Sequence, residues 1–345
     1  MLAKTSQIKL HYGFTCNSLA YTVHHRIRRS ISQVLILSPA TSSIFRNILS
    51  SFSMKSSSSN LAQLRKATGH PFVLCREALA ACNGDYSRAL AWLQKEAAKR
   101  GLAKAEKLKS RPMSQGLLGM ISTSRCVAVV EINCETDFVV RNQHFQTLVA
   151  FSTESVFKEL LSGTREPGTH RFSEEVLKTL PYADQFPKSI SDALVATIAS
   201  VGENMAIPRG VGMTLSADKT AEIGHLMAYC HATNAGLKRT VRDVHFGKYV
   251  AFLRYHHISN RKGTSAWRDQ ASQICHQLCQ HIVGMSPRPS LALDDVPPAA
   301  NPDDERCLLR QPFLFDEAIS VGELLEQNEI LLDDFVRVEC GVEEE

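Results

Sequence analysis

The clearest pattern of apolar and polar positions lies near the middle of the chain. Residues 126–132 are apolar and mostly β-branched or small, which predicts a largely buried strand. Apolar residues then recur at helical spacing, at Phe145, Leu148, Val149 and Val156. In between, Thr136 suits a helix N-cap and Asp137 suits the positive end of a helix. We therefore expect a strand-to-helix corner at residues 133–141, followed by a helix to about residue 159.

Phe138, which lies at this corner, has two interpretations. It precedes Phe145 by seven residues, so one helix would place both rings on the same stripe facing the core. Alternatively, the ring projects beyond the helix end and inserts into a partner. The local pattern alone favours the core.

Residues 60–101 show a compact helical pattern. Leu61, Leu64 and Thr68 share one face of a short first helix, and Pro71 can occupy the first turn of a second. Asn83-Gly84 is a turn signal before a third helix. We expect a small three-helix bundle.

Within the second helix, Phe72 and Val73 lie outside the apolar face that is expected to point inward. They either form an exposed contact surface or pack against the first helix.

Beyond residue 116 the pattern predicts antiparallel sheets with helices. Residues 116–121 pair naturally with 126–132 as a hairpin. A helix over 191–201 ends at Gly202, and an extended segment over 206–211 contains Pro208, which requires an edge or a bulge. Residues 162–190 are rich in loop signals, and the sequence does not define their structure.

The second half repeats the order of strand pair and helix. Residues 223–230 and 249–253 read as apolar strands, and residues 269–283 as a helix. Residues 102–115 alternate lysines with small residues, as expected of a solvated linker or a helix extension.

Charge is distributed unevenly along a chain whose net charge is +4. No acid precedes Glu77, and residues 1–54 are rich in Ser, Arg and His, which is typical of a mitochondrial transit peptide; a disordered arm is the alternative. Its apolar run at 34–37 is too short to cross a bilayer, so no membrane is implied. Most of the basic excess lies in this removable segment, so we infer no nucleic-acid partner. The tail from Asp303 is acidic.

The ten cysteines show no paired C-x-x-C spacing, which indicates reduced thiols. Cys275 and Cys279, near His276 and His281, lie on an apolar helix pattern, so packing is favoured over a metal site. A cysteine hydrolase built on Cys134 is a rival hypothesis, although no spacing nominates a base. The chain has no P-loop or dinucleotide fingerprint, so no cofactor and no direct nucleotide binding are expected.

Residues 134–142, Cys-Glu-Thr-Asp-Phe-Val-Val-Arg-Asn, resemble the signature of the translation elongation factor Ts family. Further ordered matches to this family lie at 64–69, 75–79, 84–85, 92–93, 202–205, 229–231, 311–314, 321–325 and 334–339. The resemblance covers about residues 60–343. No helical hairpin with heptads occurs between 285 and 311, as is typical of the mitochondrial type.

The resemblance implies a guanine-nucleotide exchange factor that forms a heterodimer with mitochondrial elongation factor Tu in the mitochondrial matrix and performs no covalent chemistry. Asp137 and Phe138, with the backbone at Val139 and Val140, would enter the GTPase near its Mg²⁺. The family's Tyr-x-His motif matches His231, although residues 232–247 and 256–268 depart from the family pattern.

The family's N-terminal ubiquitin-associated-like domain would dock on the GTPase domain through Arg65, Phe72 and Val73. The expected fold is α+β: a transit peptide (1–54), this three-helix domain (60–101), a linker (102–115) and two core subdomains (116–215 and 216–345, the second with the acidic tail). The alternative function is a ubiquitin-binding adaptor acting through residues 60–101.

Overall fold

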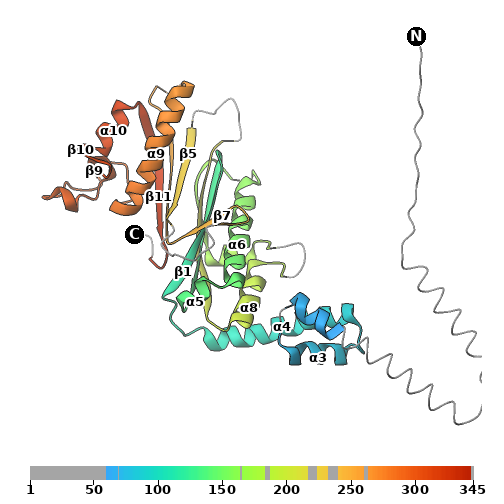
Figure 1. Cartoon of the computed structure of the whole chain (residues 1–345). Coiled ribbons are helices and arrows are strands. Elements are labelled where there is room, and N and C mark those ends of the chain that lie inside the picture. Colours follow the sequence, from blue (N-terminus) through green and yellow to red (C-terminus); the bar gives the residue numbers. More distant parts are fainter. Residues whose placement is uncertain are drawn as a thin grey trace, which may run out of the picture. The chain divides into compact units, whose positions relative to one another are not determined.

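The computed structural model (Figure 1) describes residues 60–68, 70–163, 165–182, 187–216, 224–231, 240–259 and 263–342. The expected transit peptide lies outside these residues. The chain divides into two compact units, residues 1–90 and 91–345, and we describe each by itself.

The described part of the smaller unit is helical. It comprises a helix over residues 60–68, α3 (Phe72–Ala81) and the start of α4 (Tyr86–Leu108). The predicted turn is confirmed, since Asn83 and Gly84 both have positive φ, at 53° and 80°. The third helix does not stop near Gly101, because α4 continues to Leu108; residues 102–108 are the helix extension and not a linker.

The larger unit contains a six-stranded antiparallel sheet in the order β3-β4-β2-β1-β7-β6. Its strands are β1 (Gln115–Ser122), β2 (Cys126–Cys134), β3 (Gly168–Ser173), β4 (Met205–Thr214), β6 (Thr240–Val241) and β7 (Val244–Gly247). The predicted hairpin is confirmed, with Leu117 opposite Ile132.

A second antiparallel sheet, β11-β8-β5, packs on one face of the first. Its strands are β5 (Gly224–His231), β8 (Tyr249–His257) and β11 (Ile330–Glu339). Alternate residues of β2 face opposite ways, so Val127 and Val129 join the core between the sheets while Val130 and Ile132 join the core beneath the helices. This explains why β2 is apolar at almost every position.

Helices cover the outer faces of the two sheets (Figure 1). The first sheet carries α6 (Gln143–Leu161), α7 (Glu174–Thr179) and α8 (Ile190–Val201). The second carries α9 (Ser265–Met285) and α10 (Val321–Gln327), and the short strands β9 (Pro312–Phe313) and β10 (Asp316–Ser320) extend this layer. Segment 286–311 contains only the 3₁₀ turns η2 (Pro302–Asp304) and η3 (Leu308–Arg310), which agrees with the expected lack of a helical hairpin.

Several local predictions are confirmed. Helix α8 ends at Gly202, whose φ is 94°, and Pro208 lies at a register shift between β4 and β2, beyond the end of its pairing with β3. Segment 162–190, whose structure the sequence does not define, contains β3 and α7. One expectation changes: β6 and β7 belong to the stretch assigned to the second subdomain, yet they extend the first sheet.

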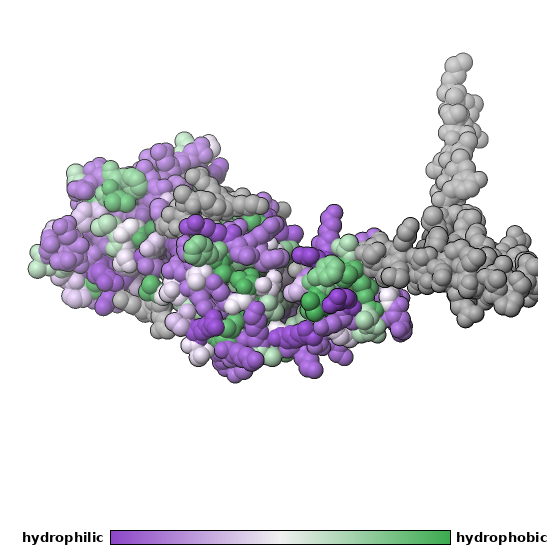
Figure 2. All heavy atoms as spheres, turned by 60° about the horizontal axis from the view of Figure 1, so that its bottom comes forward, coloured by the Kyte–Doolittle hydropathy of each residue, from purple (hydrophilic) through white to green (hydrophobic). Residues whose placement is uncertain are grey.

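The surface is mixed, with apolar patches separated by hydrophilic side chains on the face shown in Figure 2. Phe138 is the most exposed of the large apolar residues in the described part of the chain. Across the same residues, every helix is either too short or too polar to cross a membrane.

Candidate partner-binding site

The corner after β2 is built from two helices and not from one. The single turn α5 (Asp137–Val140) ends at Arg141, and Asn142 then adopts extended dihedrals and caps α6 by accepting a 2.8 Å hydrogen bond from the His144 backbone N–H. Thr136 precedes α5 but makes no side-chain cap. The predicted corner is confirmed, whereas its predicted single helix is wrong.

This break decides the position of Phe138. The ring is 77% exposed, while Phe145 is fully buried. The helical period from Phe145 does not extend back across Asn142, so the interpretation of Phe138 as a core residue is wrong. The next two residues, Val139 and Val140, are buried. Their side chains anchor the turn, and only their backbone is available to a partner.

A pair of glutamates clamps the corner to the start of β4. The Glu203 carboxylate accepts hydrogen bonds from the Thr136 backbone N–H (3.0 Å) and from its hydroxyl (2.7 Å). In the reverse direction, the Glu135 carboxylate accepts one from the Asn204 backbone N–H (2.6 Å). Hydrogen bonds to a charged acceptor are among the stronger ones in proteins. The base of the corner is therefore held rigidly on both sides.

Further contacts extend this clamp. The Asn204 side chain donates to the Arg111 carbonyl (2.9 Å), and the Arg111 guanidinium lies 3.4 Å from the Glu135 carboxylate. Behind the turn, the buried Gln146 side chain donates to the Val140 carbonyl (3.2 Å). The Val140 carbonyl, at the break between α5 and α6, thereby has a hydrogen-bond donor, as buried backbone groups require.

Asp137 lies on the outer side of the turn. Its carboxylate is 3.3 Å from the Arg141 guanidinium, and both side chains are about half exposed. An ion pair of this kind contributes on the order of 0.5 kcal/mol or less. Asp137 is therefore available to a partner at little cost.

Cys134, which ends β2 beneath the corner, is unsuited to nucleophilic catalysis. It is fully buried, and its Sγ donates to the Thr136 carbonyl at 3.3 Å. Burial, with the nearby Glu203 charge as a smaller cause, raises the pKa of this thiol to about 12. A thiol must ionise to attack, so the hydrolase hypothesis loses its nucleophile.

The thiols of α9 and its residue His281 are buried and serve packing. Cys275 and Cys279 are fully buried, and burial raises the pKa of both. His281 is buried between the Gln311 side chain (3.0 Å) and the Leu314 backbone N–H (3.2 Å). The described residues contain no group of three or more His, Cys, Asp or Glu arranged to hold a metal.

In the smaller unit, Arg65, Phe72 and Val73 are all exposed. The Arg65 guanidinium lies 5.8 Å from the centre of the Phe72 ring, within the range of a cation–π contact. Phe72 and Val73 are about half exposed, so they do not serve only to pack against the first helix.

His231 is exposed at the end of β5 and is oriented by a neighbour. Its Nδ1 lies 2.9 Å from the Tyr229 hydroxyl, and its ring is 6.2 Å from that of Tyr249. These three side chains line an open cavity of about 600 Å³ together with Phe315 and Arg337. Phe138 and His231 lie on separate elements of the larger unit, at α5 and β5.

Sequence reasoning missed the positioning role of Glu135, Glu203 and Asn204. The Gly-Glu-Asn run at 202–204 matches the family, but that match alone assigns no contact to its residues. Glu135 follows the end of β2 and Glu203 precedes the start of β4, so both could have been identified as acids next to strand ends. That each accepts hydrogen bonds from the other's neighbour depends on the pairing of β2 with β4, which local patterns do not predict.

Comparison with known proteins supports one family throughout. Residues 45–103 match the family model described as "Elongation factor Ts, mitochondrial, N-terminal", and residues 135–301 match "Elongation factor TS". The chain is 38% identical over 286 residues to "Elongation factor Ts, mitochondrial" of Aedes aegypti, covering 82% of this chain and 88% of that protein. It is 33% identical to the Homo sapiens protein of that name over 293 residues, covering 84% and 85%. The Branchiostoma floridae protein of that name is 35% identical over 310 residues, with 83% and 90% covered. The chain belongs to the elongation factor Ts family.

Proposed function

We propose that this protein promotes GDP release from mitochondrial elongation factor Tu by inserting the Asp137-Phe138 corner beside the GTPase Mg²⁺ site. The observation that carries the proposal is a large aromatic ring, 77% exposed, on a turn whose base is clamped from both sides. Leaving a ring in water on a rigid turn contributes little to the fold, but it prepares the ring for burial in a partner.

The exchange activity follows from linkage. A partner that binds nucleotide-free factor Tu more tightly than the GDP-bound form must weaken GDP binding by the same factor. Burying the Phe138 ring supplies on the order of 1.5–3 kcal/mol, which corresponds to roughly ten- to a hundredfold in affinity. Asp137 and the corner backbone would displace the ligands of the partner's Mg²⁺. Without that ion the GDP phosphates lose their main counter-charge.

Two further surfaces would hold the partner while the corner acts. The exposed group Arg65, Phe72 and Val73 would dock on the GTPase domain, and His231, oriented by Tyr229, would contact it from the second sheet. The protein would act in the mitochondrial matrix, after removal of residues 1–54. A pull-down against ubiquitin and factor Tu separates this role from the adaptor alternative: capture of ubiquitin alone would favour the adaptor.

The direct test is release of a fluorescent GDP from mitochondrial factor Tu by the chain lacking residues 1–54. We expect acceleration by the native chain, and a loss of about tenfold or more for Phe138→Ala. Leu161→Ala is the matched control, because Leu161 is also an exposed apolar residue, at the end of α6; it should retain full activity. No acceleration by the native chain would contradict the proposed function, and equal acceleration by Phe138→Ala would contradict the role of the ring.

A further inference from the structure

A buried carboxylate on β2 binds the turn that follows β11. Glu131 is only 2% exposed. Its carboxylate accepts a 2.8 Å hydrogen bond from the Arg209 guanidinium of β4 and a 2.7 Å hydrogen bond from the Gly341 backbone N–H. A buried charge is stable only when it is paired and hydrogen-bonded. These two contacts therefore account for the buried charge, and one of them comes from outside the first sheet.

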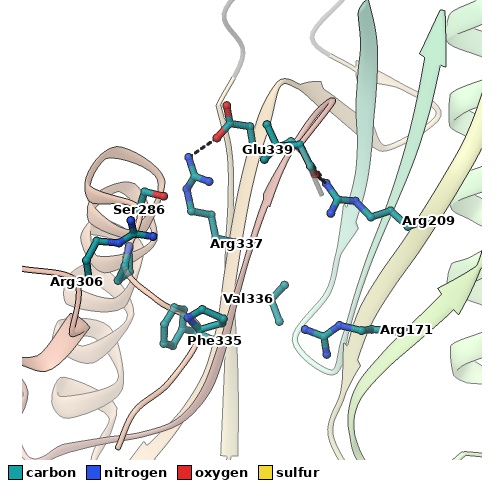
Figure 3. Close-up of a pocket in the computed structure, with 11 residues that line it drawn as sticks. Arg171, Arg209, Ser286, Arg306, Phe335, Val336, Arg337 and Glu339 are labelled. Carbon is teal, nitrogen blue, oxygen red and sulfur yellow. Dashed lines mark hydrogen bonds and ion pairs between the residues drawn. The ribbon is translucent and has the colours of Figure 1, made fainter. Parts of the chain in front are cut away.

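Arg209 binds the same turn through a second set of contacts. Its guanidinium donates to the Glu339 carbonyl at 2.8 Å and to the Val342 carbonyl at 2.5 Å. In Figure 3 Arg209 extends from the larger sheet toward the end of β11, where Arg337 pairs with Glu339. One ion pair of the first sheet thus contacts the turn at three backbone groups. We call Glu131, Arg209 and the turn at residues 340–342 the β11 latch.

Backbone hydrogen bonds lead from the latch to His231. The Cys340 N–H donates to the Lys248 carbonyl at 2.9 Å, and the Lys248 N–H donates to the His231 carbonyl at 3.1 Å. Lys248 is the residue between β7 of the first sheet and β8 of the second. The latch therefore joins β2, which leads into the Phe138 corner, to the end of β5, which carries His231.

The two sheets do not need the latch in order to pack, because apolar side chains such as Val129 and Phe252 already fill the core between them. Apolar packing has no preferred direction, whereas hydrogen bonds require defined distances and angles. A buried ion pair adds little net stability, since the loss of hydration offsets the attraction of the charges. The latch therefore serves to fix the relative position of the sheets at this end.

We propose that the β11 latch holds His231 at a fixed distance from the Phe138 corner, so that both can contact one GTPase molecule at the same time. This inference rests on the proposed function. When two contacts belong to one rigid body, the second forms with little further loss of freedom. Glu131, which is buried, is then a positioning residue that increases affinity for the partner without contacting it.

The first experiment detects the latch in the free chain, as the amide hydrogen exchange of Cys340 and Lys248 measured by NMR. Glu131→Gln keeps the size of the side chain and removes its charge, and Arg209 remains hydrated because its side chain is 19% exposed. We expect exchange at both amides to become at least about tenfold faster.

A second variant reaches the latch without altering the buried ion pair. Gly341 has a φ of 87°, and no atom lies within 4 Å of the position that a Cβ would take. Gly341→Ala therefore strains only the backbone of the turn, and exchange at Cys340 and Lys248 should become about fivefold faster. Gly163→Ala is the matched control, because Gly163 also has a positive φ, 75°, and open space around it. It should leave both amides unchanged. Unchanged exchange in both latch variants would overturn the proposal.

The second experiment tests positioning, as fluorescent GDP release from mitochondrial factor Tu at increasing concentrations of the chain lacking residues 1–54. Glu131→Gln should raise the half-maximal concentration by about fivefold and change the maximal rate by less than about twofold, because the Phe138 corner is intact. In a His231→Ala background, the same substitution should raise that concentration by no more than about twofold.

A purely structural role would give the opposite pattern. Equal increases in the half-maximal concentration in the native and His231→Ala backgrounds would overturn the positioning role, as would no increase in the native background. No acceleration by the native chain would overturn the proposed function and this role with it. The amide exchange of the free chain would still show whether the latch exists, so the two failures are distinguishable.

Discussion

Two strand-to-helix connections of the larger unit present their aromatic residues in opposite ways. After β2, the turn α5 carries Phe138, whose ring is exposed. After β8, the first turn of α9 carries Trp267, whose indole N–H donates to the Asn328 carbonyl at 2.9 Å and whose ring lies 5.0 Å from that of His257. Trp267 also lies near the rings of His225 and Tyr255.

The difference shows how a structural aromatic is distinguished from one available to a partner. Within the chain, the indole N–H of Trp267 has a hydrogen-bond acceptor and its ring lies beside other aromatic rings. At the Phe138 corner, the hydrogen bonds to Glu135 and Glu203 fix the backbone. The Phe138 ring itself is 77% exposed. The α9 corner contributes to stability through its aromatic side chain, Trp267, whereas the α5 corner would use a stable base to present Phe138.

The largest expected effect is on stability at the α9 corner. Trp267→Ala should lower the free energy of unfolding by about 2–3 kcal/mol, somewhat less than for a fully buried ring, because the indole loses packing and leaves the Asn328 carbonyl without its donor. Urea unfolding followed by circular dichroism measures this. At temperatures where the variant stays folded, GDP release should be unchanged. A loss below about 1 kcal/mol would mean that the two aromatics do not differ as described.

The next effect concerns the clamp. Glu203→Gln replaces the charged acceptor of two hydrogen bonds from Thr136 and should cost about 1–2 kcal/mol of unfolding free energy. Glu159→Gln is the control, because Glu159 makes only a partly exposed ion pair with Arg165 at 3.7 Å, worth about 0.5 kcal/mol or less. Equal losses for the two variants would show that Glu203 is an ordinary surface acid.

The buried thiol beneath the Phe138 corner predicts a dependence on alkaline pH. Because the pKa of Cys134 is raised to about 12, while an unfolded thiol has a pKa near 8.5, the folded state holds this proton more tightly. Its contribution is complete below about pH 8.5 and is lost progressively as pH rises toward 12. Between pH 8.5 and 10 the native chain should lose about 1–2 kcal/mol more than Cys134→Ala, measured by urea unfolding. The same slope in both proteins would contradict this.

The smallest expected effect is the stability change of Phe138→Ala. Since the ring is in water, its removal should alter the free energy of unfolding by less than about 0.5 kcal/mol. Circular dichroism during urea unfolding of this variant, beside Trp267→Ala, compares the two corners directly. A loss above about 1 kcal/mol would show that Phe138 packs within its own chain.

Local sequence patterns predicted most elements of the larger unit. The hairpin of β1 and β2, helix α8 with its terminal Gly202, and strands β5 and β8 each depend on short runs of apolar residues and turn signals. The strand β3 was not predicted, because Gly168–Ser173 is largely polar and pairs only along one edge. The pairing of Gly119 with Phe246, which attaches β7 to the first sheet, joins residues too far apart for any local pattern.

The candidate site shows the same limit. The corner and its signature residues could be identified from the sequence, but the exposure of Phe138 could not. The seven-residue spacing to Phe145 suggested a continuous helix, whereas Asn142 ends one helix and caps the next. An asparagine before a helical stretch is a recognisable start signal, and at position 142 it argues against a stripe shared by Phe138 and Phe145. The clamp depends on tertiary pairing and became visible only in three dimensions.

The central claim is that the clamp acts by presenting Phe138, and a double-mutant cycle in stimulated GDP release tests it most directly. Phe138→Ala should reduce the stimulated rate by about tenfold or more, and Glu203→Gln by several-fold. If the clamp works through the ring, adding Glu203→Gln to Phe138→Ala should change the rate by no more than about twofold. Two losses that multiply in the double variant, or a Phe138→Ala variant as active as the native chain, would contradict the account.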